Sequence, residues 1–137
     1  MNRSSFLKNI LGLVFGSNLI NKTTLLSFEK KVIYTGFIRG FAYYQGEKII
    51  HKLKEGATLI LRCEHQNPFD THAISINFLD HKIGYFPAED NVFFHRLLNL
   101  NPDQFHTNIS KVNPSLPPWE KVEFTVFSFQ QSSNQTL

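Results

Sequence analysis

The sequence predicts a mainly β fold, a small and partly open β-barrel of five or six strands with one helix inserted before the last two strands. Three observations support this prediction. The 137 residues, 42% of them hydrophobic, are enough to bury one core but too few for two domains. Fourteen residues are Phe, and the excess of aromatic and branched side chains favours strands. Short segments with strand periodicity follow one another along the chain, with a single helical pattern near residue 90.

The predicted strands are recognised by apolar side chains at alternate positions. They cover residues 32–39, 57–63, 72–78, 82–86, 107–112 and 122–129. The first has apolar side chains on both faces, which we expect of a strand that closes a small barrel. The step Asp80-His81 turns the chain between the third and fourth segments, so these two should form a hairpin.

A helix is predicted over residues 88–100. Pro87 stands next to its start, and Glu89 and Asp90 occupy the first turn, where the positive end of the helix dipole favours acids. Apolar side chains at helical spacing then form a stripe that we expect to face the core. The stripe consists of Phe93, Phe94, Leu97 and Leu98.

The chain divides into an N-terminal segment and linker (1–28), a barrel domain (29–130) and a polar tail (131–137). Residues 1–20 combine a basic start with an apolar stretch that is too short to span a bilayer as a helix. They resemble a twin-arginine export signal in which Ser4 replaces the second arginine, but a short amphipathic helix packed on the barrel explains the same pattern. A cytoplasmic location is favoured, and export to the periplasm stays open.

The formal charge of +3 does not by itself indicate a nucleic-acid partner. The excess comes from Arg3, Lys8 and Lys22, and the rest of the chain is neutral overall. A phosphate-binding surface in the domain would therefore depend on local clustering of basic side chains. The candidates are Arg39, Lys48, Lys52, Lys54 and Lys82.

We expect no metal, no cofactor and no catalytic activity. Cys63 is the only cysteine, the six histidines lack metal-ligand spacing, and no phosphate-binding or nucleophile motif is present. Asp70 and His72 would share one face of a strand, which leaves a hydrolase as a rival. The simpler interpretation is that Asp70 caps the turn after Asn67-Pro68-Phe69.

Five blocks in the same order resemble the HIRAN domain family. Residues 67–76, NPFDTHAISI, are similar to the family signature NPYDxxAIxV, with Phe69 in place of the usual Tyr. The other blocks are the aromatic turn at 40–46, the lead into the next strand at 53–61, the hairpin end KIGYFP at 82–87, and the final loop and strand at 113–114 and 118–123.

The resemblance implies an OB-like barrel that binds DNA and is not catalytic. In the best-understood members the domain captures the 3′ end of a single strand. We therefore expect single-stranded DNA or a DNA 3′ end as partner, a monomer, and a family context that includes helicase or nuclease partners. Carried over by position, Tyr43 and Phe69 stack bases, with Tyr44 as a further candidate. Asp70 accepts a hydrogen bond from the terminal hydroxyl, and Tyr85 lines the pocket.

Two positions depart from the family pattern. Ala42 replaces an Arg that precedes the aromatic pair in end-capturing members, and Ala88 replaces a basic residue that is frequent in bacterial relatives. Arg39 could take over a phosphate contact if the strand register places it on the face of Phe41 and Tyr43.

Each site residue has a structural alternative. Of the adjacent Tyr43 and Tyr44, one would point into the core if the strand continues, and we expect Tyr43 to be the exposed one. Phe69 could close the barrel end, and Tyr85 could merely line the barrel. Trp119 could stack a further base or pack at a strand start. The rival function on the same fold is a protein-interaction or cell-envelope module that has lost DNA binding.

Overall fold

The computed structural model describes residues 26–132. Residues Glu29–Gln130 form one compact unit. The predicted export or amphipathic segment at 1–20 and most of the predicted polar tail lie outside the described residues. Within the described part, no helix combines the length and the apolar character that crossing a membrane requires.

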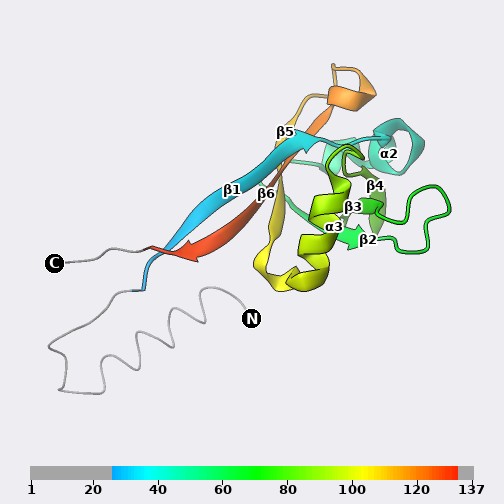
Figure 1. Ribbon diagram of the computed structural model, residues 1–137. Coiled ribbons are helices and arrows are strands. Elements are labelled where there is room, and N and C mark those ends of the chain that lie inside the picture. The colour runs from blue at the N-terminus through cyan, green and yellow to red at the C-terminus, as the bar shows by residue number, and fades with distance from the viewer. Residues whose placement is uncertain (1–25, 133–137) are drawn as a thin grey trace, which may run out of the picture. The chain divides into compact units, whose positions relative to one another are not determined.

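Six strands form one antiparallel sheet in the order β1-β6-β5-β2-β3-β4 (Figure 1). The strands are β1 (Phe28–Phe37), β2 (Thr58–Cys63), β3 (Ile74–Phe78), β4 (His81–Tyr85), β5 (His106–Val112) and β6 (Val122–Gln131). Each lies where strand periodicity predicts one. The mainly β class and the helix before the last two strands are thereby confirmed.

The predicted barrel is not confirmed, because the sheet is open, with β1 and β4 at its edges. Most of β1 is exposed, including Val32 and Ile33, so apolar side chains on both faces did not indicate closure. An isolated antiparallel bridge joins Arg39, just after β1, to Tyr85 at the end of β4, so the chain beyond one edge strand reaches the other edge strand. There the Arg39 amide donates to the Tyr85 carbonyl at 2.9 Å, and the Tyr85 amide donates to the Arg39 carbonyl at 2.8 Å.

Gly84 lies at the point where this bridge is made. Its φ of +155° is a conformation that side-chain-bearing residues rarely adopt. A Cβ at this position would lie 2.4 Å from the Arg39 carbonyl oxygen and 2.4 Å from Ile38 Cγ2. A register shift in the facing strand, between Ile76 and Asn77, accompanies this close approach. Gly84 therefore allows the chain after β1 to reach β4.

Three short helical segments lie between β1 and β2 and were not predicted. They are η1 (Phe41–Tyr43), α2 (Gly46–Ile49) and η2 (Ile50–Lys52), each four residues or fewer. They bury Phe41 and Ile49 against the sheet. Two further one-turn segments, η3 (Pro102–Gln104) and η4 (Pro118–Glu120), precede β5 and β6.

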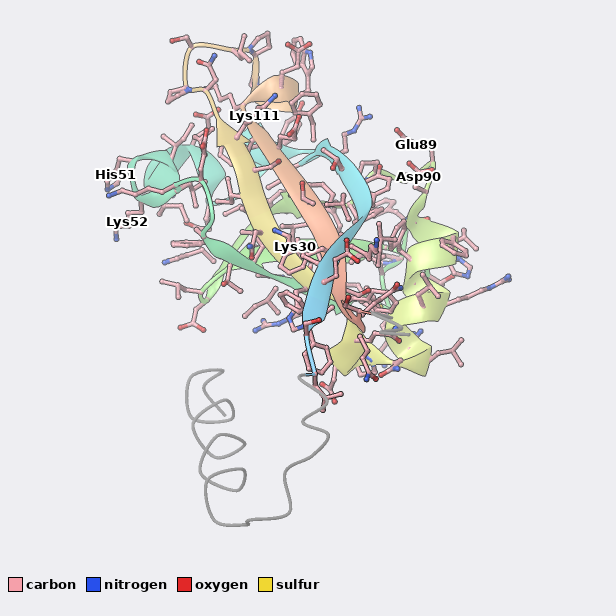
Figure 2. The ribbon with its side chains drawn as sticks, turned by 90° about the vertical axis from the view of Figure 1, so that its left-hand side faces the viewer. Lys30, His51, Lys52, Glu89, Asp90 and Lys111 are labelled. Atoms are coloured by element: carbon pink, nitrogen blue, oxygen red, sulfur yellow. The ribbon has the colours of Figure 1, made fainter. Side chains whose placement is uncertain are left out.

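The helix α3 (Asn91–Leu100) begins three residues later than predicted, so Glu89 and Asp90 are not in its first turn. The segment from Pro87 to Asp90 forms a turn instead, closed by a hydrogen bond from the Asp90 amide to the Pro87 carbonyl at 3.1 Å. Figure 2 shows Glu89 and Asp90 together at this end of α3. Both carboxylates bond to the chain around β1: Glu89 to the Arg39 guanidinium at 2.8 Å and Asp90 to the Tyr34 hydroxyl at 2.8 Å.

The buried face of α3 includes three residues of the predicted stripe, the buried Phe94 and the partly buried Leu97 and Leu98, which pack against the core. Phe93 is 62% exposed, so its assignment to the core was wrong. The buried positions are Asn91, Phe94 and His95, which follow the i, i+3, i+4 spacing of one helix face. Polar side chains at two of these positions hid that part of the face from a search for apolar stripes. Phe94 packs with Phe86 at a ring-centroid distance of 4.8 Å, which fixes α3 to the sheet next to the end of β4.

A candidate nucleic-acid interface

An open pocket of about 900 Å³ lies beside the end of β2. Its walls come from four segments: Tyr44 after η1, the loop 64–73, the end of β4, and the start of α3. The loop contains the NPFD motif. The pocket brings together Tyr44, Phe69, Asp70 and Tyr85 of the predicted site residues.

Asn67 shapes the loop. Its Oδ1 accepts hydrogen bonds from the amides of Phe69 at 2.9 Å and Asp70 at 3.1 Å, and its Nδ2 donates to Glu64 Oε1 at 3.1 Å. This side-chain turn is typical of Asn before Pro. The Phe69 ring is left 96% exposed at the pocket rim, so it does not close the end of a barrel.

Asp70 caps the same turn and joins it to α3. Oδ1 accepts a hydrogen bond from the His72 amide at 2.8 Å, and Oδ2 accepts one from Asn91 Nδ2 at 2.7 Å. These bonds, Asn91 first, lower the pKa of Asp70, so the carboxyl is ionised at neutral pH. The side chain is still 38% exposed. Residues 70–73 form a turn and not the strand that the hydrolase alternative assumed, and within this turn His72 Nδ1 lies 4.0 Å from Asp70 Oδ1.

Glu64 is the centre of a hydrogen-bond network on the opposite wall. Tyr85 donates its hydroxyl to Glu64 Oε1 at 2.6 Å, and Lys82 Nζ lies 2.7 Å from Oε2. Lys82 also donates to the Tyr85 hydroxyl at 2.9 Å. Burial acts to raise the pKa of Glu64, but the bonds from Lys82, Tyr85 and Asn67 outweigh it and hold the pKa below its ordinary value. The network fixes the orientation of the Tyr85 ring in the pocket wall.

The strand does not continue through the two adjacent tyrosines. Tyr43 ends η1 and Tyr44 follows it with extended backbone, and neither ring is buried in the core. Tyr43 is 87% exposed, as expected. Tyr44 is half-exposed and lines the pocket, where its ring meets the edge of Tyr85 at 5.3 Å.

Arg39 and Trp119 do not line the pocket. Phe41 is buried and belongs to η1, so Arg39 shares no strand face with Phe41 and Tyr43. The Arg39 guanidinium forms an ion pair with Glu89 instead. Trp119 lies on η4 and is 58% exposed, away from the pocket walls.

Sequence reasoning missed Glu64, Asn91 and His95. Glu64 directly follows a predicted strand, a position at which a side chain often reaches a site, and this was the available signal. Asn91 and His95 gave no signal in the sequence, because their contacts are with residues on other elements.

The HIRAN domain model matches residues 32–129. The chain belongs to the HIRAN domain family. The match spans more than half of the chain and confirms the resemblance drawn from the five sequence blocks. No curated protein matches.

Two solved structures are similar to this HIRAN chain. One is a protein from Lactobacillus plantarum, with a TM-score of 0.61 and 19% sequence identity, covering 77% of this chain and 100% of that one. The other is the HIRAN domain of human HLTF, with a TM-score of 0.55 and 14% identity, covering 75% of this chain and 81% of that one. At these identities the likeness concerns the fold. HIRAN domains are generally nucleic-acid-binding modules and are not catalytic.

Proposed function

We propose that this HIRAN protein is a non-catalytic module that binds single-stranded DNA and recognises a free 3′ hydroxyl end. The observation that supports the proposal best is the composition of the pocket. Its rim and walls present the aromatic rings of Phe69, Tyr44 and Tyr85 around the ionised carboxylate of Asp70.

The exposed rings suit unpaired bases. Phe69 and Tyr43 are 96% and 87% exposed, so their faces are free to stack on a base. Stacking contributes about 1–3 kcal/mol per base whatever the base is. The bases of a duplex already stack on one another, so the exposed rings of Phe69, at the pocket rim, and of Tyr43, which does not line the pocket, favour single strands or ends.

Asp70 suits a terminal hydroxyl. Each carboxylate oxygen has two lone-pair sites, and Asn91 and the His72 amide occupy one on each oxygen. An ionised carboxylate can only accept hydrogen bonds, so it favours a hydroxyl and repels a phosphate. Among the described residues, no Lys or Arg side chain lines the pocket. The nearby Lys82 and Arg39 are neutralised by Glu64 and Glu89, so this end of the site disfavours additional negative charge.

The first test compares strands that end in a 3′ hydroxyl or a 3′ phosphate. The wild type is expected to bind the hydroxyl strand at least about tenfold more tightly, because charges 4 Å apart repel by about 1 kcal/mol in water and about 4 kcal/mol at a protein surface. Asp70→Asn retains the acceptor for the His72 amide and removes the charge, so it should bring the two affinities to within about threefold. Fluorescence anisotropy at low and moderate salt, with duplex as a third ligand, measures this difference.

Asp103→Asn is the matched control. Asp103 is exposed on η3, beyond the far end of α3, and its change should leave the preference intact. Equal affinity of the wild type for both ends would contradict end recognition.

A protein-interaction or envelope module on the same fold is the second candidate. It is favoured by the ion pairs of Arg39 with Glu89 and of Lys82 with Glu64. These pairs leave the pocket without a free basic side chain among the described residues. Absence of binding to any DNA at low salt would make it the better account.

A further inference from the structure

Three imidazole rings join the loop 64–73 to α3, and one of them, His65, also lines the pocket. The His95 ring lies edge-on to two rings of the loop, with centroid distances of 4.7 Å to His65 and 5.3 Å to His72. His95 is on the buried face of the helix and is 6% exposed. The contact between loop and helix therefore depends on groups that can each take up a proton.

His95 is buried with one nitrogen unpaired. Its Nδ1 lies 3.1 Å from Asn99 Nδ2, whereas its Nε2 has no hydrogen-bond partner among the described residues. If the Asn99 amide donates to Nδ1, the imidazole proton is on Nε2 and makes no bond. A second proton, on Nδ1, would require the Asn99 amide to turn its oxygen toward the ring, and the proton on Nε2 would stay buried without an acceptor among the described residues.

The charges around His95 come from the loop and from β2. His65 and His72 face it, His72 Nδ1 lies 4.0 Å from Asp70 Oδ1, and the Cys63 thiol lies 4.0 Å from the His95 carbonyl oxygen. Burial lowers the pKa of His95 first, the two histidines lower it further, and Asp70 acts in the opposite direction. His95 is therefore uncharged at neutral pH. Within residues 26–132, no group of three His, Cys, Asp or Glu side chains is placed to hold a metal ion.

The same loop and helix hold Asp70 in the pocket. Asn91 lies one turn before His95 on the same face of α3 and donates to Asp70 Oδ2. Any separation of the loop from this face would break that bond. It would also displace the ring of Phe69, the residue that precedes Asp70 in the loop. The imidazole cluster and the pocket thus belong to one loop-to-helix contact.

We propose that the cluster of His65, His72 and His95 makes the pocket sensitive to acid: protonation drives the loop 64–73 away from α3, releases Asp70 from Asn91 and weakens DNA binding. The effect on DNA rests on the proposed function. The movement of the loop is a property of the free protein.

The direction of the effect follows from the protons bound in each state. The pKa of His95 is lower in the closed form than in an open form, where it approaches the ordinary value of about 6.5. The closed form is therefore fully favoured above about pH 6.5 and is lost as the pH falls below it, by up to about tenfold in population per pH unit for one proton. Asp70 has a lowered pKa, so its own protonation does not produce the change.

The test follows two signals between about pH 7.5 and pH 5.5. NMR signals of the Asn91 side-chain amide, which donates to Asp70 and belongs to a residue that does not titrate, report the loop-to-helix contact in the free protein. Anisotropy with a 3′-hydroxyl single strand at constant ionic strength reports binding. We expect the Asn91 amide signals to shift over the same pH range and the dissociation constant to rise by up to about tenfold.

Two variants separate His95 from the other histidines. His95→Phe retains the ring and cannot take up a proton, so the Asn91 amide signals and the affinity should stay constant over this range. His51→Gln changes an exposed histidine on η2 and should keep the wild-type pH dependence. If His95→Phe does not fold, the double variant His65→Gln, His72→Gln replaces it and should move the transition to lower pH by removing the like charges.

The possible results distinguish the two proposals. Asn91 amide signals that do not respond to pH in the wild type would overturn the acid-sensitive contact, whether or not DNA binds. A wild-type pH response retained in His95→Phe would also overturn it. A loop that responds to pH in a protein that binds no DNA would support the contact and contradict the proposed function.

Discussion

Gly84→Ala is expected to lower the free energy of unfolding by roughly 2–6 kcal/mol, a large part of the stability of a domain of this size. The added Cβ would meet the Arg39 carbonyl oxygen and Ile38 Cγ2, both at 2.4 Å. The first is a backbone atom held in the bridge to Tyr85, and the second belongs to a fully buried side chain, so neither can move cheaply. The φ of +155° adds strain. Urea unfolding at neutral pH measures the loss.

Gly56→Ala is the matched control. Gly56 also has a positive φ, +84°, but a Cβ there would meet nothing within 4 Å. Its replacement should cost only the backbone strain, about 1–2 kcal/mol. If both variants lose the same free energy, the close approach of the chain at Gly84 does not contribute to stability, and the bridge between the two ends of the sheet is weaker than its hydrogen bonds indicate.

The strands were predictable because their periodicity reflects burial. Residues 57–63 and 107–112 alternate in the sequence and differ by one residue from the observed β2 and β5. The sequence of β1 was misleading, since apolar side chains on both faces of a strand arise at an exposed edge as well as in a closed barrel. The segments η1 and α2 span three and four residues, which is too short for a helical period to be visible.

The candidate site was predictable only in part, for a related reason. The motif NPFD predicted the turn, because Asn before Pro shapes the backbone locally, but it left open whether Phe69 stacks on a base or closes the barrel end. The partner of Asp70 is 21 residues away on another element, and only the packing of α3 on the sheet brings Asn91 to it. The pairing of Arg39 with Glu89 is likewise a consequence of the turn at Pro87, which no periodicity indicates.

The double variant Tyr43→Ala, Phe69→Ala is expected to weaken binding to single-stranded DNA by roughly thirtyfold or more. Each ring contributes about 1–3 kcal/mol by stacking, and about 1.4 kcal/mol corresponds to a factor of ten in affinity. Because the two side chains are 87% and 96% exposed, the free energy of unfolding should change by less than about 0.5 kcal/mol. Anisotropy with a 3′-hydroxyl strand and urea unfolding of the same preparations measure both quantities.

Phe93→Ala is the control for the loss of an exposed ring. Phe93 is 62% exposed on α3 and does not line the pocket, so its removal should leave DNA affinity unchanged. A double variant that binds as tightly as the wild type would show that the exposed rings of Tyr43 and Phe69 do not hold bases. Trp119 on η4 would then be the most exposed of the remaining aromatic candidates from the sequence, and loss of binding in Trp119→Ala would place the DNA on that side of the fold. If neither change affects binding, the aromatic surface is available for a protein partner.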